Sequence, residues 1–164
     1  MRILGIDPGT YHMGLGVVDS EGSDLSLVHV TVLSPRKADP LAVRLHTMYE
    51  ELQVLLRQFM PGSVAIEQPF VSRNVRAAMA VGQAQAVAMV ACAGQGLDVT
   101  GYSPSQVKQA VTDYGASSKE QVQEMVRALL GLDEIPEPTD AADALAVAIC
   151  HINSSRASEL ALHE

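Results

Sequence analysis

The chain has 164 residues, a length that suits one domain with a single substantial core. Apolar residues make up 48% of it, which excludes an intrinsically disordered chain. Its formal net charge of −8 argues against a surface that is basic throughout. Nucleic-acid binding depends on where the cations cluster, however, and two arginines gather in the segment VSRNVR.

The cysteines and the N-terminus bear on where the protein works. Cys92 and Cys150 lie in Ala- and Val-rich segments, as buried free thiols commonly do; they favour a reducing compartment and show no metal-binding spacing. The N-terminus lacks the basic start, apolar segment and cleavage site of a signal peptide. Gln83, Gln85 and Gln95 interrupt the Ala-rich stretch, so we expect no membrane span and a cytoplasmic protein.

Three strands open the predicted fold. The aliphatic segments RILGID, MGLGVVDS and LSLVHVTVLS are joined by short connections, which predicts an antiparallel meander. An amphipathic helix follows over 39–59, with Asp39-Pro40 as its start signal and Pro61-Gly62 beyond its end. Its apolar residues recur at steps of four and three on one face: Leu41, Leu45, Met48, Leu52, Leu55 and Phe59.

The rest of the chain alternates strands with helices. SVAIEQ and DVTGYS are predicted strands, and the helix between them, over 74–96, is apolar on nearly every side, which is typical of a buried or an interface helix. Two helices with a serine near the start, SPSQVKQAVTDYG and SSKEQVQEMVRALLGL, precede the Pro-rich IPEPT and a last helix, DAADALAVAICHI. This order predicts a mixed five-stranded α/β sheet with helices on its faces. We expect one domain over 1–155 and a short flexible tail over 156–164.

Four acidic residues are notable for their positions. Asp7 ends the first strand in LGIDPG, and Glu67 directly follows three apolar strand residues in VAIEQP. Asp140 and Asp143 lie three apart at the start of the last helix, so they share a face. Structural alternatives exist: Asp7 could cap the turn at Pro8-Gly9, and Asp140 could be a helix N-cap with Asp143 at the third position. Glu67 is harder to explain in this way.

Together the four carboxylates favour a metal site. In open α/β sheets, functional groups gather at strand ends and helix starts. Carboxylates brought together there repel one another, and divalent cations remove that conflict. Oxygen ligands without a His/Cys cluster indicate Mg²⁺ or Mn²⁺ rather than Zn²⁺. Two such ions roughly 4 Å apart catalyse in-line phosphodiester hydrolysis.

The first motif also fits another function. GIDPGTYHMGLGVVD resembles the phosphate-binding opening of the sugar-kinase, actin and heat-shock ATPase superfamily, in which the aspartate holds Mg²⁺. That alternative predicts a nucleotide-binding, ATPase-like domain. The chain is short for two such domains and the cleft between them, and Glu67 with the late aspartate pair favours nuclease chemistry.

As a whole, the sequence resembles the RuvC-type Holliday junction resolvases of the ribonuclease H-like superfamily. The resemblance runs through ILGIDPGTYHMGLGVVD, VAIEQPFVSRNVRAAMAVGQA, YSPSQVKQAVTDYG, SSKEQVQEMVRALLGL and DAADALAVAICH, which together span nearly the whole chain. It implies a ribonuclease H-like mixed five-stranded sheet with helices on both faces. Asp7, Glu67, Asp140 and Asp143 then correspond to the four catalytic, metal-binding acids; some relatives have a histidine where this chain has Asp140.

The resemblance also implies a substrate and partners. Its members cut four-way DNA junctions by paired symmetric nicks in recombination and repair, act as homodimers with Mg²⁺ and work beside a branch-migration motor. The Ala-rich helix with Gly82 is a candidate dimer contact, although a buried core helix would explain its composition equally well. The nearest competitor is a YqgF-type nuclease of ribosomal RNA precursors, which lacks the EQPFVSRN to VGQA arrangement.

Six further residues are candidate DNA contacts. Phe70, flanked by Pro69 in a chain with two phenylalanines and no tryptophan, suits base stacking, although it could instead fill the core beneath its loop. The others are polar or cationic residues that could contact phosphates: Arg73, Asn74, Arg76, Lys108 and Lys119. For Arg76 in particular, a solvated surface charge is an equally good interpretation.

Overall fold

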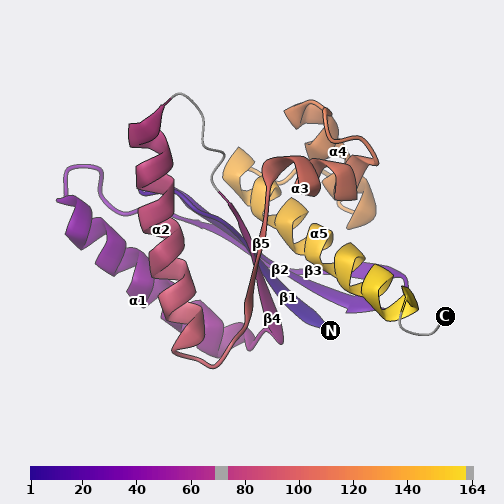
Figure 1. The fold of residues 1–164 in the computed structure, drawn as a ribbon, viewed down its shortest axis with the longest axis horizontal. Helices are drawn as coiled ribbons and strands as arrows, with labels where there is room; N and C mark the ends of the chain where they lie inside the picture. The colour runs from indigo at the N-terminus through magenta and orange to yellow at the C-terminus, as the bar shows by residue number, and fades with distance from the viewer. Residues whose placement is uncertain (69–73, 162–164) are drawn as a thin grey trace.

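The computed structural model describes residues 1–68 and 74–161, which form one five-stranded sheet covered by helices (Figure 1). The strands are β1 (Arg2–Asp7), β2 (Met13–Glu21), β3 (Asp24–Leu33), β4 (Ser63–Glu67) and β5 (Val99–Tyr102). The helices are α1 (Leu41–Phe59), α2 (Val75–Ala93), α3 (Pro104–Thr112), α4 (Lys119–Leu129) and α5 (Thr139–Ala161).

The sheet is mixed, with the order β3-β2-β1-β4-β5. The first three strands form the predicted antiparallel meander, and β4 and β5 continue the sheet parallel to β1. The carboxyl ends of β1, β4 and β5 therefore meet at one edge. Ile6 pairs with Ile66, so Asp7 and Glu67, each one residue further along, are neighbours at that edge.

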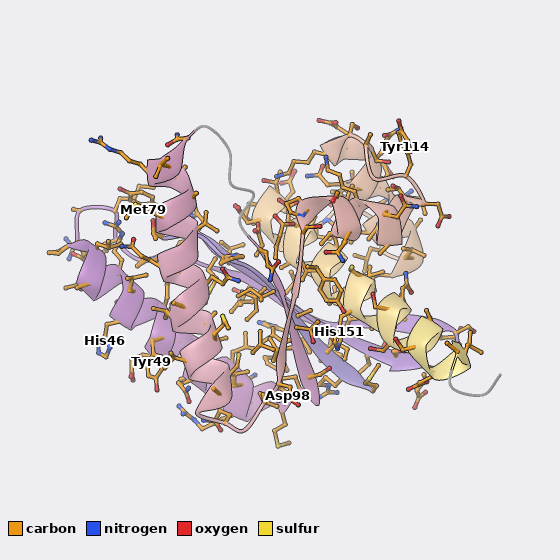
Figure 2. The ribbon with its side chains drawn as sticks, in the orientation of Figure 1. His46, Tyr49, Met79, Asp98, Tyr114 and His151 are labelled. Atoms are coloured by element: carbon orange, nitrogen blue, oxygen red, sulfur yellow. The ribbon has the colours of Figure 1, made fainter. Side chains whose placement is uncertain are left out.

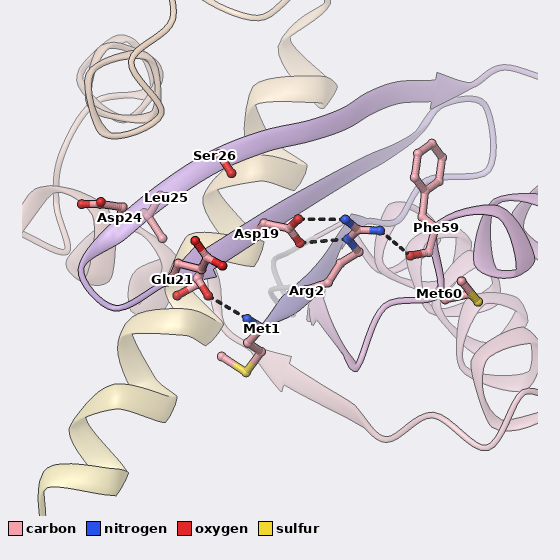
Figure 3. A pocket seen from close by; sticks show the side chains of 10 residues that line it. Met1, Arg2, Asp19, Glu21, Asp24, Leu25, Ser26, Phe59 and Met60 are labelled. Atoms are coloured by element: carbon pink, nitrogen blue, oxygen red, sulfur yellow. Dashed lines mark hydrogen bonds and ion pairs between the residues drawn. The ribbon is translucent and has the colours of Figure 1, made fainter.

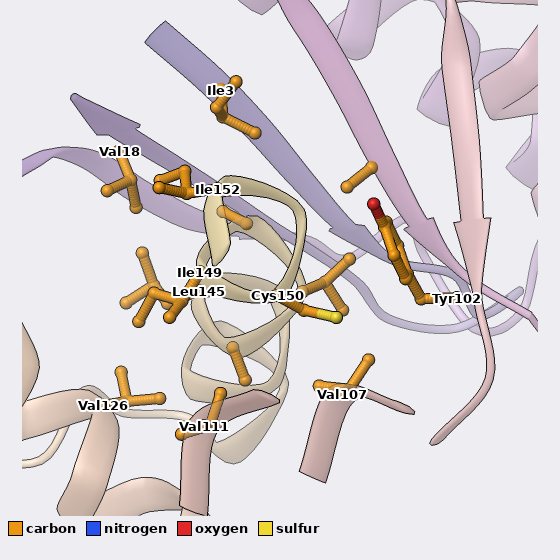
Figure 4. Packing of buried hydrophobic residues seen from close by; sticks show 14 of the residues in the cluster. Ile3, Val18, Tyr102, Val107, Val111, Val126, Leu145, Ile149, Cys150 and Ile152 are labelled. Atoms are coloured by element: carbon orange, nitrogen blue, oxygen red, sulfur yellow. The ribbon is translucent and has the colours of Figure 1, made fainter. Parts of the chain in front are cut away.

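Helices cover both faces of the sheet, as predicted. On one face, Leu4, Ile6 and Ile66 pack with residues of α1 and α2. On the other, Ile3 and Ala65 pack with α3, α4 and α5 (Figure 4). Because side chains alternate along a strand, Asp7 lies on the same face as Ile3, and Glu67 on the same face as Ala65. Both acids thus fall on the face that α5 covers.

Two glycines let α5 approach the sheet closely. A Cβ atom at Gly5 would collide with the backbone carbonyl of Ala144, and one at Gly14 would collide with the carbonyl of Asp140. The helix surface facing them is built from alanines such as Ala144 and Ala148, both fully buried. The first turns of α5 therefore lie almost directly on the backbones of β1 and β2.

Serine caps begin two of the helices. Ser103 and Ser118 each accept a hydrogen bond from the backbone N–H three residues ahead, and Gln106 and Gln121 close the reciprocal half of each capping box. Such a cap typically stabilises a helix by about 1 kcal/mol. The start signal predicted for α1 was wrong in detail: Pro40 is the N-cap, with no side-chain hydrogen bond, and Asp39 instead offers its carbonyl to Arg44.

The last helix is longer than expected. The predicted flexible tail began at residue 156, but α5 continues to Ala161. Arg156 accounts for part of this extension, because its guanidinium donates to the Ser20 hydroxyl and to the Gly22 carbonyl. Residues 156–161 are therefore helical, and Arg156 bonds the start of this segment to residues at the turn between β2 and β3.

Helix α2 is not the buried core helix that its composition allowed. Only Ala84, Ala88, Ala91 and Cys92 of its residues are buried. By length and composition alone α2 could cross a membrane, contrary to the expectation from its glutamines, but the core helices of soluble proteins meet the same criteria. Its buried stripe packs against the sheet and α1. The rest of its apolar surface is exposed, which favours the interface interpretation.

A recess of about 640 Å³ lies at the far end of β1, around Arg2 and Asp19 (Figure 3). Arg2 makes two 2.8 Å hydrogen bonds to the Asp19 carboxylate and one of 3.0 Å to the Phe59 carbonyl. These bonds join β1, β2 and the end of α1. The recess lies opposite the acidic edge and its principal charges are paired, so we assign it a structural role.

Candidate active site

Three separate elements bring the four acidic residues to one edge of the sheet. Asp7 ends β1, Glu67 ends β4, and Asp140 and Asp143 lie in the first turns of α5. Gly14 links the two halves of the site, because it is the register partner of Asp7 and lies directly beneath the Asp140 carbonyl. The predicted grouping is therefore present in the structure.

The structural alternatives for these acids explain less. No hydrogen bond joins the Asp7 carboxylate to residues 8–10, which the structure describes, so the side chain does not cap that turn. Helix α5 begins at Thr139, which places Asp140 in its first turn rather than at the N-cap. An acid there still interacts favourably with the helix dipole.

The carboxylates share one electrostatic environment. Burial and, to a smaller extent, the charges of Glu67, Asp143 and Asp140 together raise the pKa of Asp7 to about 8, against the opposing effect of Lys119. Burial likewise raises the pKa of Glu67 to about 7, with a contribution from Asp143. At neutral pH the site therefore holds protons that exposed carboxyls would have lost.

Two lysines provide the compensating positive charge. The Lys119 ammonium lies 2.6 Å from Oδ2 of Asp143 and opposes the rise that burial causes in the pKa of that carboxyl. Lys108 and Lys119 both act to lower the pKa of Glu67. A recess of about 200 Å³ contains Glu67, Asp143 and both lysines between α3, α4 and α5. The Lys119 side chain is 51% exposed, so it can also reach a ligand from solvent.

The donor set suits a hard divalent cation. Asp7, Glu67, Asp140 and Asp143 offer only carboxylate oxygens, partly buried and mutually repelling, which is the ligand chemistry that Mg²⁺ and Mn²⁺ prefer. Within residues 1–68 and 74–161, no three His, Cys, Asp or Glu side chains are arranged in a geometry that could already hold a metal ion. The fit to a divalent cation therefore rests on the chemistry of the donors and not on a preformed coordination geometry.

Of the other predicted DNA contacts, Asn74 and Arg76 belong to the described residues, and neither lines the acidic recess. Phe70 and Arg73 lie outside the described residues. Asn74 is the N-cap of α2, where its side-chain oxygen accepts a 3.1 Å hydrogen bond from the Ala77 N–H. Arg76 is exposed in the first turn of α2. Among the described residues, only Lys108 and Lys119 of the predicted cations line the acidic recess.

One supporting residue was missed by the sequence analysis. Arg44 on α1 is buried, donates to the carbonyls of Thr10 and Asp39, and stacks its guanidinium 4.3 Å from the centre of the Tyr11 ring. It thereby holds the turn that follows Asp7 against α1. The signal was available, because an arginine between Leu41 and Leu45 borders the apolar stripe of that helix.

The sheet has this mixed order, acids end two of its parallel strands, and two more acids begin a helix laid across them. This arrangement defines a ribonuclease H-like protein with an acidic edge. Comparison with known families is specific. The family model described as crossover junction endodeoxyribonuclease RuvC matches residues 3–151. This chain belongs to the RuvC family.

Individual relatives support the same assignment. A crossover junction endodeoxyribonuclease RuvC of Dehalococcoides mccartyi is 51% identical over 151 residues, which cover 92% of each chain. The corresponding protein of Chloroflexus aggregans is 49% identical, with the same coverage of 92%. A solved structure of Thermus thermophilus RuvC in complex with Holliday junction substrate matches with a TM-score of 0.92 at 39% identity, covering 96% of both chains.

Proposed function

We propose that this chain is a structure-selective endonuclease that resolves four-way DNA junctions by hydrolysing phosphodiester bonds. One observation carries the proposal: acids from β1, β4 and α5 meet at a single edge, and Lys108 and Lys119 border them. The family supports it, since the Thermus relative was solved with a Holliday junction substrate. In this role the lysines contact phosphates near the scissile bond.

We propose that Asp7, Glu67, Asp140 and Asp143 hold Mg²⁺, for which Mn²⁺ can substitute, with two ions in each site. Such a pair supplies an activated water and stabilises the leaving oxygen in phosphodiester hydrolysis. The chain's own contribution is to hold the carboxylates in place, through the register of β1 on β4 and the close approach of α5. The raised pKa values of Asp7 and Glu67 mean that cation binding displaces protons near neutral pH.

We also propose that the protein acts as a homodimer through α2. Val75, Met79 and Val90 are 62–64% exposed and lie on one stripe of the helix with Ala86. Gly82 falls on the same stripe, with open space above it. Beside the stripe, an apolar groove is lined by Tyr49 and His46 of α1 together with Leu45, Ala86, Val87 and Val90 (Figure 2).

A two-fold dimer gives a reason for symmetric cutting. It carries one acidic edge per subunit, and a two-fold axis relates those edges to strands of like polarity in a near-symmetric junction. We propose that Phe70 stacks on an unpaired base and that Arg73, Asn74 and Arg76 contact the strand that passes the acids. The partnership with a branch-migration motor, implied by the family resemblance, belongs to the same proposal.

The test is a nicking assay on a mobile four-way junction, with a linear duplex of the same sequence as control. We expect two symmetric nicks that require Mg²⁺ or Mn²⁺, ligatable products, and no cutting of the linear duplex. The Asp7→Asn protein serves as the inactive control. Equal cutting of the duplex, or cutting that persists in EDTA, would contradict the proposal.

A further inference from the structure

A polar relay crosses the apolar core on the α5 side of the sheet. His151 is only 9% exposed and lies at the junction of α5 and the sheet (Figure 2). Its Nε2 atom is 3.0 Å from the Ser63 hydroxyl, and its Nδ1 atom is 2.9 Å from the Tyr102 hydroxyl. The three residues join α5 to the beginning of β4 and the end of β5.

The geometry points to His151 as a positioning residue for the acidic site: its bonds to Ser63 and Tyr102 fix how far α5 slides along the sheet, and therefore where Asp143 lies relative to Glu67. This inference deepens the proposed function and rests on it. It assigns a role to a buried residue that touches none of the carboxylates.

The repeat distances of helix and strand support this register. Eight residues separate Asp143 from His151, a rise of about 12 Å along a helix. Four residues separate Ser63 from Glu67, which span about 13 Å along a strand. Because the two lengths match, the His151–Ser63 hydrogen bond at one end sets Asp143 level with Glu67 at the other.

The hydrogen bonds of the relay require specific distances and angles, whereas the apolar contacts between α5 and the sheet around it do not. Beneath α5 the sheet presents Gly5 and Gly14, and the helix presents Ala144 and Ala148. These small surfaces fix how closely the helix approaches, and Leu145 and Ile149 of α5 pack beside them without hydrogen bonds that specify one register. A neutral imidazole has one donor and one acceptor, so it is satisfied only when both hydroxyls lie at the correct distance. Burial lowers the pKa of His151, which favours that neutral form.

The other side-chain bonds of α5 lead to elements other than β4. Lys119 on α4 binds Asp143, and the Cys150 thiol donates to the Gln106 carbonyl on α3. Asn153 donates to the Ala110 carbonyl, which ties α5 to α3, a helix without any of the four acids. Arg156 reaches the Ser20 hydroxyl and the Gly22 carbonyl through a long, partly exposed side chain. Only the relay connects α5 to β4, the strand that carries Glu67, through a side-chain hydrogen bond within the described residues.

The test compares His151→Leu, which keeps an apolar side chain but loses both bonds, with His151→Gln, which retains a donor and an acceptor. Ile152→Val is the matched control, since Ile152 is the fully buried neighbour on α5 and takes no part in the relay. Two measurements are made on each: Mn²⁺ affinity by calorimetry without DNA, and the single-turnover nicking rate at saturating junction. Junction affinity is measured separately in EDTA.

We expect His151→Leu to weaken Mn²⁺ binding and slow nicking by about tenfold or more, as misplaced active-site groups do, with junction affinity unchanged. His151→Gln should recover most of both, and Ile152→Val should match the wild type even if its melting temperature falls equally. A His151→Leu protein that behaves like Ile152→Val at equal melting temperature would overturn the inference.

Two milder variants cover the case in which His151→Leu does not fold. Ser63→Ala and Tyr102→Phe each remove one hydroxyl, and we expect each to lower Mn²⁺ affinity by a few-fold; wild-type affinity in both would also overturn the inference. The calorimetric measurement separates the two proposals. A protein that binds Mn²⁺ in a relay-dependent way but cuts no junction retains the positioning role and refutes the proposed function.

Discussion

Lys119 on α4 places its ammonium 2.6 Å from the Asp143 carboxylate on α5. The contact links the helix with the strongest segregation of polar and apolar faces to the helix that carries two of the four acids. Because the lysine side chain is half exposed, it can also turn toward a phosphate. The same residue can therefore balance charge in the free protein and contact DNA in the complex.

Lys119→Ala should reduce the log-log salt slope of junction binding by about one, the value for one lost phosphate contact. Arg57→Ala is the control, because Arg57 is exposed in the last turn of α1, away from the acids, and should leave the slope unchanged. The measurement is junction affinity in EDTA across a series of salt concentrations. An unchanged slope for Lys119→Ala would mean that Lys119 contacts Asp143 but no phosphate of the junction.

Asp7→Asn should reduce nicking by about 10²-fold or more while leaving junction binding as tight as in the wild type, or tighter. The amide keeps the shape of the side chain but removes a charge that faces both the proposed ions and the phosphates. In the metal-free protein the same change should raise the melting temperature above about pH 8, where Asp7 would otherwise be a buried, ionised carboxylate that repels the other three acids. Asp98→Asn, at an exposed site, is the control (Figure 2).

The metal-free protein should lose stability as pH rises from about 5 to 8. Asp7 and Glu67 keep their protons up to pH values near 8 and 7 in the folded state, whereas unfolded carboxyls release theirs near about pH 4. The folded state thus binds more protons in this range, so raising the pH favours unfolding. Melting curves in EDTA should show the loss, and Mg²⁺ should reverse it most at high pH. A flat profile in EDTA would contradict the raised pKa values.

Val90→Glu should convert the proposed dimer to a monomer without lowering the melting temperature of the subunit, because Val90 is 63% exposed on the α2 surface. Gln58→Glu adds the same charge at an exposed site on α1 and should leave the dimer intact. Light scattering at the concentrations used for cleavage gives the mass. A Val90→Glu protein that remains dimeric would place the subunit contact elsewhere.

Phe70→Tyr should nick junctions nearly as fast as the wild type, whereas Phe70→Leu should be much slower, because a flat ring is what stacks on a base. Such stacking contributes about 1–3 kcal/mol per base. If Phe70 instead fills the core, the Phe70→Leu protein should keep a higher melting temperature and a faster nicking rate than the Phe70→Tyr protein. Single-turnover rates and melting curves of both variants distinguish these outcomes.

The sequence was sufficient to predict the fold class and the gathering of the four acids at one edge of the sheet, for related physical reasons. Asp7 and Glu67 interrupt apolar strand patterns, and Asp140 and Asp143 lie at the start of an apolar helix. Each acid therefore stands out from the apolar pattern of its own element. Strand and helix patterns are local, and they placed each acid at the end of an element. Parallel strands then bring such ends to one edge.

What the sequence could not show depends on contacts between distant segments. The His151–Ser63 bond joins residues 88 positions apart, and no local pattern distinguishes this histidine from one on a surface. Composition showed that α2 is apolar, but it could not show whether other elements of the same chain bury that apolar surface. The extension of α5 to Ala161 likewise depends on Arg156 meeting the turn between β2 and β3.

Gly14 touches both halves of the acidic site without having a side chain. It faces Asp7 across the β1–β2 ladder and lies beneath the Asp140 carbonyl. The distance between the strand acid and the helix acid is consequently set by two polypeptide backbones in direct contact, with no side chain between them. A single methyl group at this position would lift the start of α5 and shift one member of the site relative to the other, with no acidic residue altered.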